Sequence, residues 1–370
     1  MLRLKSAALA VALAGISSGA LAGDLMINGF MNVNAGITST DDISSDGYDS
    51  DLSFANQTIA GLQLVKQVND STSATVQLVS RGADDYKTEA SWVYFTYSVN
   101  ENTDIRMGRL RTPTYHYSDF LEVGYAYNWI TPSSLIYLPS ALSSFNGIDL
   151  THRFTLGGMD GYVQLYTGRF GGDLETGGDT YYLDLNPNRG AIFSLTSGDI
   201  TGRISYHNAK LSMDLDPTAG RALDNLLAGA TLANVGDEFT ADESDTKYYQ
   251  ASFSYDNGST SAIAEWTSLD HETAIFNDSV SYMIGGAQRF GMATVHLTYV
   301  ATEDELESGV VGVLQKNAES KENSIILGVR YDYDSATAFK IEAERNDEEL
   351  VGGAEGESGM IYRVGMALVF

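Results

Sequence analysis

The chain of 370 residues has no cysteine and only five prolines, and it has no helix-length apolar run after residue 22. The absence of cysteine excludes disulfide frameworks and thiolate metal sites. The absence of long apolar runs excludes membrane-spanning helices, which need about 20 consecutive apolar residues. Basic residues are also scarce, since 22 Lys and Arg stand against 49 Asp and Glu, and the resulting net charge of −27 argues against nucleic acid as a partner.

The first 22 residues have the pattern of a signal peptide. Arg3 and Lys5 precede the apolar run 7–16, and Ala20-Leu21-Ala22 is the small-residue pattern that signal peptidase reads. A run this short disfavours a membrane anchor. We expect cleavage before Gly23 and a single domain over 23–370. Loss of two basic residues leaves 20 and moves the net charge from −27 to −29.

What the chain does contain is glycine, tyrosine and short alternating segments. It has 37 glycines and 22 tyrosines, and 43% of its residues are hydrophobic. With membrane-spanning helices excluded, this composition is compatible with two classes of protein, a soluble β-protein and a membrane β-barrel. Segments of about ten alternating residues separated by turn signals favour the barrel. In the segment 25–38, for example, Leu25, Ile27 and Met31 alternate with Asn28 and Asn32.

Short and long connections alternate along the chain. Seven tight turns are expected, at 68–70, 100–102, 157–160, 197–199, 256–258, 290–292 and 334–336, and eight longer and more acidic loops separate them. Together these connections join sixteen antiparallel strands. Strict alternation of this kind is typical of an up-and-down transmembrane barrel, and only a closed sheet satisfies every backbone group in hydrocarbon. We therefore expect the strand from Leu25 to pair with the last strand, Met360 to Phe370.

The segment 111–146 differs from all the others. It is long, nearly free of charge and rich in aromatic residues, and its only carboxylates are Asp119 and Glu122. A loop of this length is functional or disordered, and its aromatic content argues against disorder. We interpret it as a constriction loop folded into a pore.

Three features, taken in order and together with the strand count, resemble the Gram-negative general porins. They are Ile27-Asn28-Gly29-Phe30 near the start, the Gly-Arg-x-x-x-Pro entry to the third loop (Gly108, Arg109 and Pro113), and the terminal Phe370. The resemblance covers the whole mature chain. It implies a sixteen-stranded outer-membrane barrel of a Gram-negative bacterium, with an inward-folded third external loop.

The resemblance also implies partners. A homotrimer is expected, although the short second loop, 82–88, lacks the length that latches onto a neighbouring subunit in many porins. Phe370 and Tyr362, on the alternating last strand, are expected to be read by the outer-membrane assembly machinery. The Pro-Glu-Phe-Gly-Gly sequence of enterobacterial porins is absent from the third loop, so constriction residues cannot be carried over one by one.

The charges of the lumen follow from the parity of the strands, because a charge on the lipid face costs about 2–4 kcal/mol at the midplane. We expect the constriction to be formed by Asp119, Glu122, Tyr115, Tyr117, Arg81, Arg109, Arg111 and Arg363. Four further arginines are expected to line the lumen nearer the short-turn rim, namely Arg106, Arg153, Arg203 and Arg330. The alternative is that these arginines only pair with neighbouring acids.

The external loops have two further features. Their many carboxylates predict an acidic vestibule, with divalent cations bridging to lipopolysaccharide as the more specific hypothesis. The long loop 208–245 contains Asp216-Pro217 before an amphipathic segment, which predicts a capped helix.

The sequence contains no catalytic signature. The five histidines are scattered, with no His-x-x-x-His pair, and there is no Gly-x-Ser-x-Gly elbow. We expect neither an enzyme nor a cofactor. The predicted function is passive diffusion of small hydrophilic solutes and ions, with weak cation preference. The alternative is a substrate-selective channel whose loop aromatics form a binding track.

Overall fold

The computed structural model describes residues 25–40, 46–137, 143–176, 178–316, 319–350 and 354–370. The proposed cleavage site at residues 22 and 23 and Pro139 of the third loop lie outside these ranges. Among the described residues, no helix is long and apolar enough to cross a membrane.

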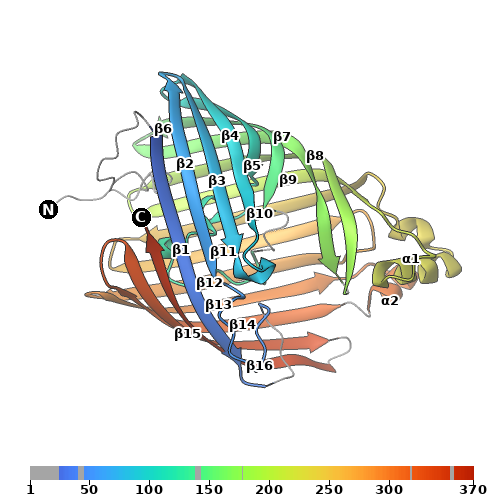
Figure 1. Cartoon of the computed structure of the whole chain (residues 1–370). Helices are drawn as coiled ribbons and strands as arrows, with labels where there is room; N and C mark the ends of the chain where they lie inside the picture. Colours follow the sequence, from blue (N-terminus) through green and yellow to red (C-terminus); the bar gives the residue numbers. More distant parts are fainter. Residues whose placement is uncertain (1–24, 41–45, 138–142, 177, 317–318, 351–353) are drawn as a thin grey trace.

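Sixteen antiparallel strands close into one barrel in which each strand pairs with its sequence neighbours (Figure 1). The strands are β1 Leu25–Thr38, β2 Ile59–Asn69, β3 Thr72–Arg81, β4 Thr88–Asn100, β5 Thr103–Arg111, β6 Ser144–Leu156, β7 Met159–Thr176, β8 Asp179–Ser197, β9 Ile200–Met213, β10 Ser244–Asp256, β11 Thr260–His271, β12 Asp278–Phe290, β13 Ala293–Glu305, β14 Ser320–Asp332, β15 Thr337–Leu350 and β16 Ala354–Val369. The predicted strand number and all seven short turns are confirmed.

The barrel closes between its first and last strands, as predicted. Phe30 pairs with Val369 and Thr38 with Ile361. Beyond β16, the backbone N–H of Gly29 donates to the carbonyl of Phe370 at 2.7 Å, and the N–H of Phe370 donates back at 3.0 Å. A Cβ on Gly29 would lie 2.3 Å from the Phe370 ring, so glycine lets this ring pack over the first strand.

Three predicted boundaries are wrong. The sequence predicts a second strand over Leu52 to Gln67, but residues 52–58 belong to the first loop, because the hydroxyl of Thr58 turns back onto the carbonyl of Phe54 at 2.6 Å. The connection between β7 and β8 is short, because both strands continue past bulges at Gly168/Phe170 and Leu185/Asn188. β9 also runs on to Met213, so the long loop starts later than residue 208.

The helix of the fifth loop forms, but without the predicted cap. Helix α1 spans Ala222–Leu232, and its N-cap residue Arg221 makes no side-chain capping bond. Asp216 instead accepts hydrogen bonds from the N–H of Thr218 at 2.9 Å and from its hydroxyl at 2.7 Å, which holds a turn before the helix. A second helix, α2 Gly309–Gln315, lies in the seventh loop at the same end of the barrel (Figure 1).

Candidate pore constriction

The third loop lies inside the barrel. It leaves β5 at Arg111 and returns at β6, and its two ends are joined by a hydrogen bond from the N–H of Thr112 to the carbonyl of Ser143 at 2.8 Å. Between them are two short 3-10 turns, η2 Ser118–Phe120 and η3 Gly124–Ala126. The loop contacts strands that are far away in the sequence, so it crosses the lumen as predicted.

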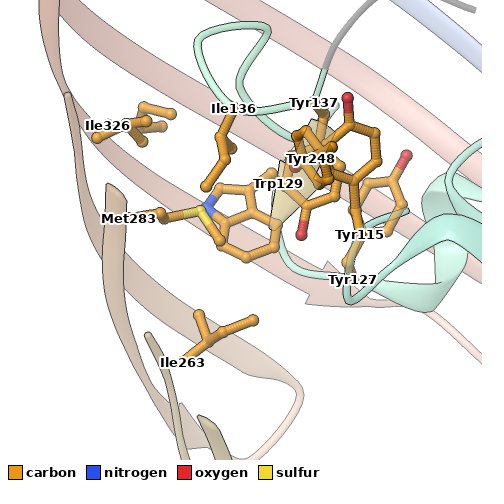
Figure 2. Packing of buried hydrophobic residues seen from close by; sticks show 10 residues of the cluster. Tyr115, Tyr127, Trp129, Ile136, Tyr137, Tyr248, Ile263, Met283 and Ile326 are labelled. Atoms are coloured by element: carbon orange, nitrogen blue, oxygen red, sulfur yellow. The ribbon is translucent and has the colours of Figure 1, made fainter. Parts of the chain in front are cut away.

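The aromatic residues of the loop attach it to one wall (Figure 2). Tyr115, Tyr127, Trp129, Ile136 and Tyr137 are buried against inward-facing residues of β10 to β14, which are Tyr248, Ile263, Met283, Val300 and Ile326. Tyr117 is half-buried and packs edge to face on Trp129, with ring centroids 5.6 Å apart. Tyr115 and Tyr117 therefore anchor the loop, and the rings do not form the exposed track of the alternative hypothesis.

Two cations of the wall bind the backbone of the loop. The ammonium of Lys340 on β15 is buried and donates to the carbonyls of Gly124 (2.5 Å), Tyr127 (2.9 Å) and Trp129. Arg330 on β14 donates to the carbonyls of Tyr125 (2.7 Å) and Tyr127 (2.8 Å). Positive charges thus hold the loop by main-chain oxygens, which satisfies carbonyls that would otherwise be buried without partners.

The entry of the loop is held by a second set of wall residues. Arg203 on β9 donates to the carbonyls of Pro113 and Thr114. Glu265 on β11 accepts from the N–H of His116 at 2.8 Å and from the hydroxyl of Tyr137 at 2.5 Å. Burial lowers the pKa of His116 to about 4, with Arg203 adding to the effect, so the ring is neutral at neutral pH. Arg203 and Arg330 lie near the short turns along the chain, but their side chains reach the loop.

Glu122 is buried in a charge cluster. Its carboxylate pairs with Arg81 of β3 and, at 2.8 Å, with Arg111, and Arg81 also pairs with Glu89. Burial on its own would raise the pKa of Glu122, but Arg111 and Arg81 outweigh it and lower the pKa. The arginines pair directly with Glu122, as in the alternative interpretation, so Glu122 is neutralised by its partners and is not an open lip of the pore.

Asp119 has the opposite environment. It is exposed on η2 and makes no ion pair among the described residues. Its carboxylate interacts electrostatically with Arg106 of β5 and with Tyr162 of β7, across from the wall that holds the loop. Arg106, whose side chain is 28% exposed, is itself paired with Asp149. Asp119 is therefore within electrostatic range of Arg106, and Arg106 acts at the level of the loop and not only in the lower lumen.

Arg363 and Arg153 are both inside the barrel, but away from Asp119. Arg363 on β16 is buried and pairs with Asp46 of the first loop at 2.7 Å, and with Glu342 and Glu344 of β15. Arg153 pairs with Asp104 at 2.7 Å and is half exposed. Each of these arginines pairs with a neighbouring acid, which is the alternative stated for the lumen arginines. Arg363 also links the first loop to the wall.

The prediction for Arg109 is wrong. It pairs across the sheet with Val93 of β4 and Asn146 of β6, on the outward face that Met107 also occupies. Met107 and Val93 are exposed there. Strand alternation places Arg109 on the side opposite to Arg106, so it cannot line the constriction. Tyr362 is also outward and exposed, as its predicted role on the last strand requires.

The sequence interpretation missed the wall residues that hold the loop. Lys340, Glu342 and Glu344 occupy alternate positions of β15 and are all buried. Glu342 accepts from the N–H of Ile130 at 2.8 Å. Three charged residues at period two on one strand were the available signal, since none of them tolerates the lipid face.

Comparison with known proteins adds a family and a fold. A family model described as "Gram-negative porin" matches residues 6–365. No curated protein matches the chain.

Similar solved structures are the outer membrane channel DcaP of Acinetobacter baumannii and an anion-selective porin from Comamonas acidovorans. DcaP has 11% identity and a TM-score of 0.64, with 94% of this chain and 97% of that chain covered. The Comamonas porin has 14% identity and a TM-score of 0.59, with coverage of 94% and 99%. OmpT of Vibrio cholerae, in a trimer form, has 13% identity and a TM-score of 0.54, with coverage of 94% and 100%.

Proposed function

This chain belongs to the Gram-negative porin family, and on that premise we propose that Asp119 sets the ion preference of its pore. As a member of the family it is an outer-membrane channel through which small hydrophilic solutes and ions diffuse passively. The observation that carries the proposal is the contrast between two carboxylates of one loop. Glu122 is buried between two arginines, whereas Asp119 is exposed and unpaired among the described residues.

The proposed preference is weakly cationic. A unit charge about 7 Å from a permeating ion contributes about 0.6 kcal/mol in water, which is a factor of about 2.7 in relative permeability. Arg106 opposes the effect of Asp119, but Asp149 offsets its charge. The numerous carboxylates of the external loops contribute little, because salt screens exposed charges over about 8 Å.

The test is the reversal potential of the purified channel in a planar bilayer under a salt gradient. Asp119→Asn is expected to move the preference toward anions by about twofold to threefold, and less in high salt. Asp70→Asn, which removes one charge from the short turn between β2 and β3, serves as the matched control. An unchanged reversal potential in Asp119→Asn would contradict the proposal.

We further propose a homotrimer that associates through the outward face of β1 to β3. Exposed aromatic residues such as Phe193, Trp266 and Tyr299 recur on β8 to β16, where they fit an aromatic belt at the lipid interface. The described residues of β1, β2 and β3 include no exposed aromatic side chain. A face without such a belt is suited to contact with protein. OmpT, a structural neighbour, has a trimer form.

Because the chain has no cysteine, single cysteines can test this interface. Leu62→Cys on the outward face of β2 is expected to give cross-linked oligomers with a bismaleimide. Leu297→Cys, an equally outward position on β13, is the control and is expected to remain uncross-linked. The reverse pattern would place the interface elsewhere.

Three further proposals concern export and the membrane. The signal peptide is cleaved before Gly23, and Phe370 with the last strand is read by the assembly machinery. Outward carboxylates at the long-loop rim are proposed to hold divalent cations against lipopolysaccharide phosphates, and two of them, Glu303 and Asp347, also pair with Lys321 and Arg345. Removal of magnesium by a chelator is then expected to reduce lipopolysaccharide retained on the purified protein, and Glu303→Gln to reduce it further. Equal retention with and without the chelator would exclude cation bridging.

A further inference from the structure

A cavity of about 320 Å³ lies in the wall of the lumen, between the third loop and the external ends of β7 to β11. This volume is at the lower end of the range of small-molecule sites. Its apolar lining includes six leucines, which are Leu121, Leu174, Leu183, Leu185, Leu211 and Leu269, and four aromatic rings of tyrosine and phenylalanine. The lumen of a porin is polar, so an apolar hollow of this size within it is a departure that suggests a ligand.

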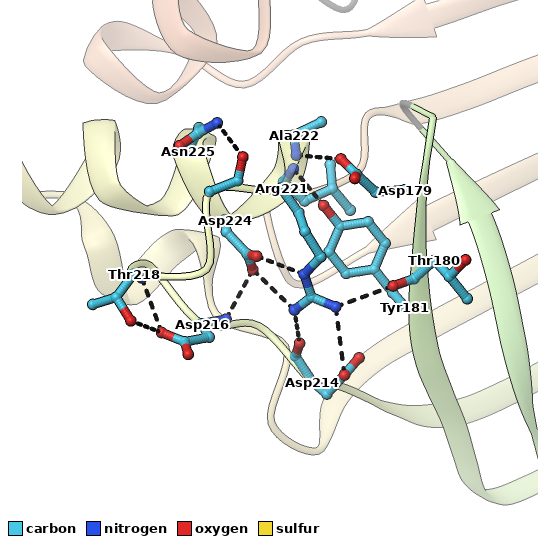
Figure 3. Close-up of polar contacts among 12 residues, drawn as sticks. Asp179, Thr180, Tyr181, Asp214, Asp216, Thr218, Arg221, Ala222, Asp224 and Asn225 are labelled. Carbon is cyan, nitrogen blue, oxygen red and sulfur yellow. Dashed lines mark hydrogen bonds and ion pairs between the residues drawn. The ribbon is translucent and has the colours of Figure 1, made fainter.

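The fifth loop packs beside this cavity. Leu183 and Leu211 belong to a buried cluster on which Leu215 and Leu223 of the fifth loop pack. Arg221 holds that loop in place, because it pairs with Asp224 at 2.6 Å, donates to the carbonyl of Thr180 at 3.0 Å and lies 4.3 Å from the ring centroid of Tyr181 (Figure 3). One side of the cavity is therefore bordered by ordered structure before any ligand arrives.

The charged group at the cavity is a buried arginine. Arg111 is 8% exposed, and its Nη2 pairs with Glu122. Its Nε and Nη1 are buried without hydrogen-bond partners among the described residues. Two unmatched donors on a buried guanidinium favour an acceptor that is missing, and a single carboxylate oxygen can accept from Nη1.

The lining has no acidic residue among the described residues, although the chain has 49 of them. Arg111 is the charged side chain of this lining. This composition disfavours a cation. It combines an apolar surface with one anion-binding end.

We propose that the cavity is a binding subsite for small amphiphilic organic anions, with a ring or branched alkyl body among the leucines and a carboxylate at Arg111. The inference rests on the proposed channel, because the ligand reaches the cavity from the lumen. Bound solute narrows the passage beside Ser118 of η2, which also lines the cavity, so binding interrupts the ion current.

Single-channel recording in planar bilayers tests the subsite with 4-phenylbutyrate as the probe. We expect interruptions at least tenfold longer than those with butyrate, which lacks the ring, or with 4-phenylbutylamine, which carries the opposite charge. Equal interruptions by all three compounds, or none with 4-phenylbutyrate, would overturn the proposal. The open-channel current in the same records tests the pore itself, so failure of the channel and failure of the subsite are distinguishable.

Ala209 of β9 lines the cavity, so a larger side chain at this position would fill it. Ala209→Phe is expected to shorten the interruptions at least tenfold, while Ala262→Phe, the same change on the outward face of β11, leaves them as in the native protein. If Ala209→Phe does not assemble, Leu269→Asn removes apolar contact at a half-buried position and is expected to shorten them at least threefold. Native interruptions in whichever of these variants assembles would overturn the proposal.

Discussion

Lys340 gives the sharpest test of how the third loop is held. Its ammonium is 5% exposed and donates to three loop carbonyls, those of Gly124, Tyr127 and Trp129. Lys340→Met keeps the length of the side chain and removes all three donors. The reason to expect a local effect is that Lys340 lies on a strand whose own ladder with β14 and β16 is unaffected.

The magnitude follows from the hydrogen bonds. Bonds from a charged donor contribute about 1.5–3 kcal/mol each and are not additive, so we take a total of about 3–5 kcal/mol for the three. The population of the inward position of the loop then falls by a factor of about 10² to 5 × 10³ relative to displaced positions. Arg330, Glu265 and Trp129 still hold the loop, so we expect fluctuation and not complete release.

Single-channel conductance and its noise measure this expectation directly. Lys340→Met is expected to give larger and noisier open currents, and liposome swelling with larger sugars is expected to increase. Lys247→Met, on the outward side of β10, is the control for loss of a lysine. Native conductance, native noise and a native sugar size limit in Lys340→Met would refute the reasoning, because the three carbonyls would then need no donor.

Three other perturbations have defined outcomes. Glu122→Gln leaves Arg81 and Arg111 buried without their shared counter-charge and is expected to cost about 3–5 kcal/mol of stability. The loss is measured as cleavage of the loop by protease at lower denaturant concentration. Because the pKa of Glu122 is lowered, the stabilisation by its ion pairs is complete above the unfolded pKa of about 4.3 and is lost as pH falls through the lower folded value. The folded pKa of His116 is about 4, so the contribution of its neutral ring to stability is complete above about pH 6.5 and is lost as pH falls toward 4. His116→Gln is therefore expected to reduce the loss of thermal stability between pH 7 and pH 5. An unchanged loss would contradict this. Deletion of Phe370 removes the backbone pair with Gly29, and outer-membrane yield by fractionation is expected to fall, whereas a normal yield would exclude a role in assembly.

The barrel could be predicted because its determinants are local. Turn residues such as Asp256-Asn257-Gly258 need only their neighbours to form, and alternation of Ile325, Leu327 and Val329 states which face is apolar. The first strand has the predicted bounds, 25–38. Boundaries failed where a contact from another segment decided them, as at Thr58.

The constriction could be predicted only in part, because its contacts join residues far apart in the chain. Arg109 and Arg111 have the same parity on β5, yet Arg111 reaches Glu122 inside the barrel, so parity alone does not separate the two arginines. No local rule shows that Arg203 reaches Pro113 across 90 positions, or that Arg106 lies within electrostatic range of Asp119. These depend on how deeply the loop descends, which its aromatic packing on β10 to β14 determines.

The residues that hold the third loop in place are different from the residue that gives it an exposed charge. Lys340, Arg330 and Arg203 bind main-chain carbonyls, and any side chain at those loop positions would present the same oxygens. Asp119, by contrast, makes no contact that fixes the loop among the described residues. Substitution at Asp119 can therefore change ion preference while the loop stays in place, whereas substitution at Lys340 moves the loop without changing its charges. We therefore expect Lys340→Met to change the pore size and Asp119→Asn to change the ion preference, each without the other effect.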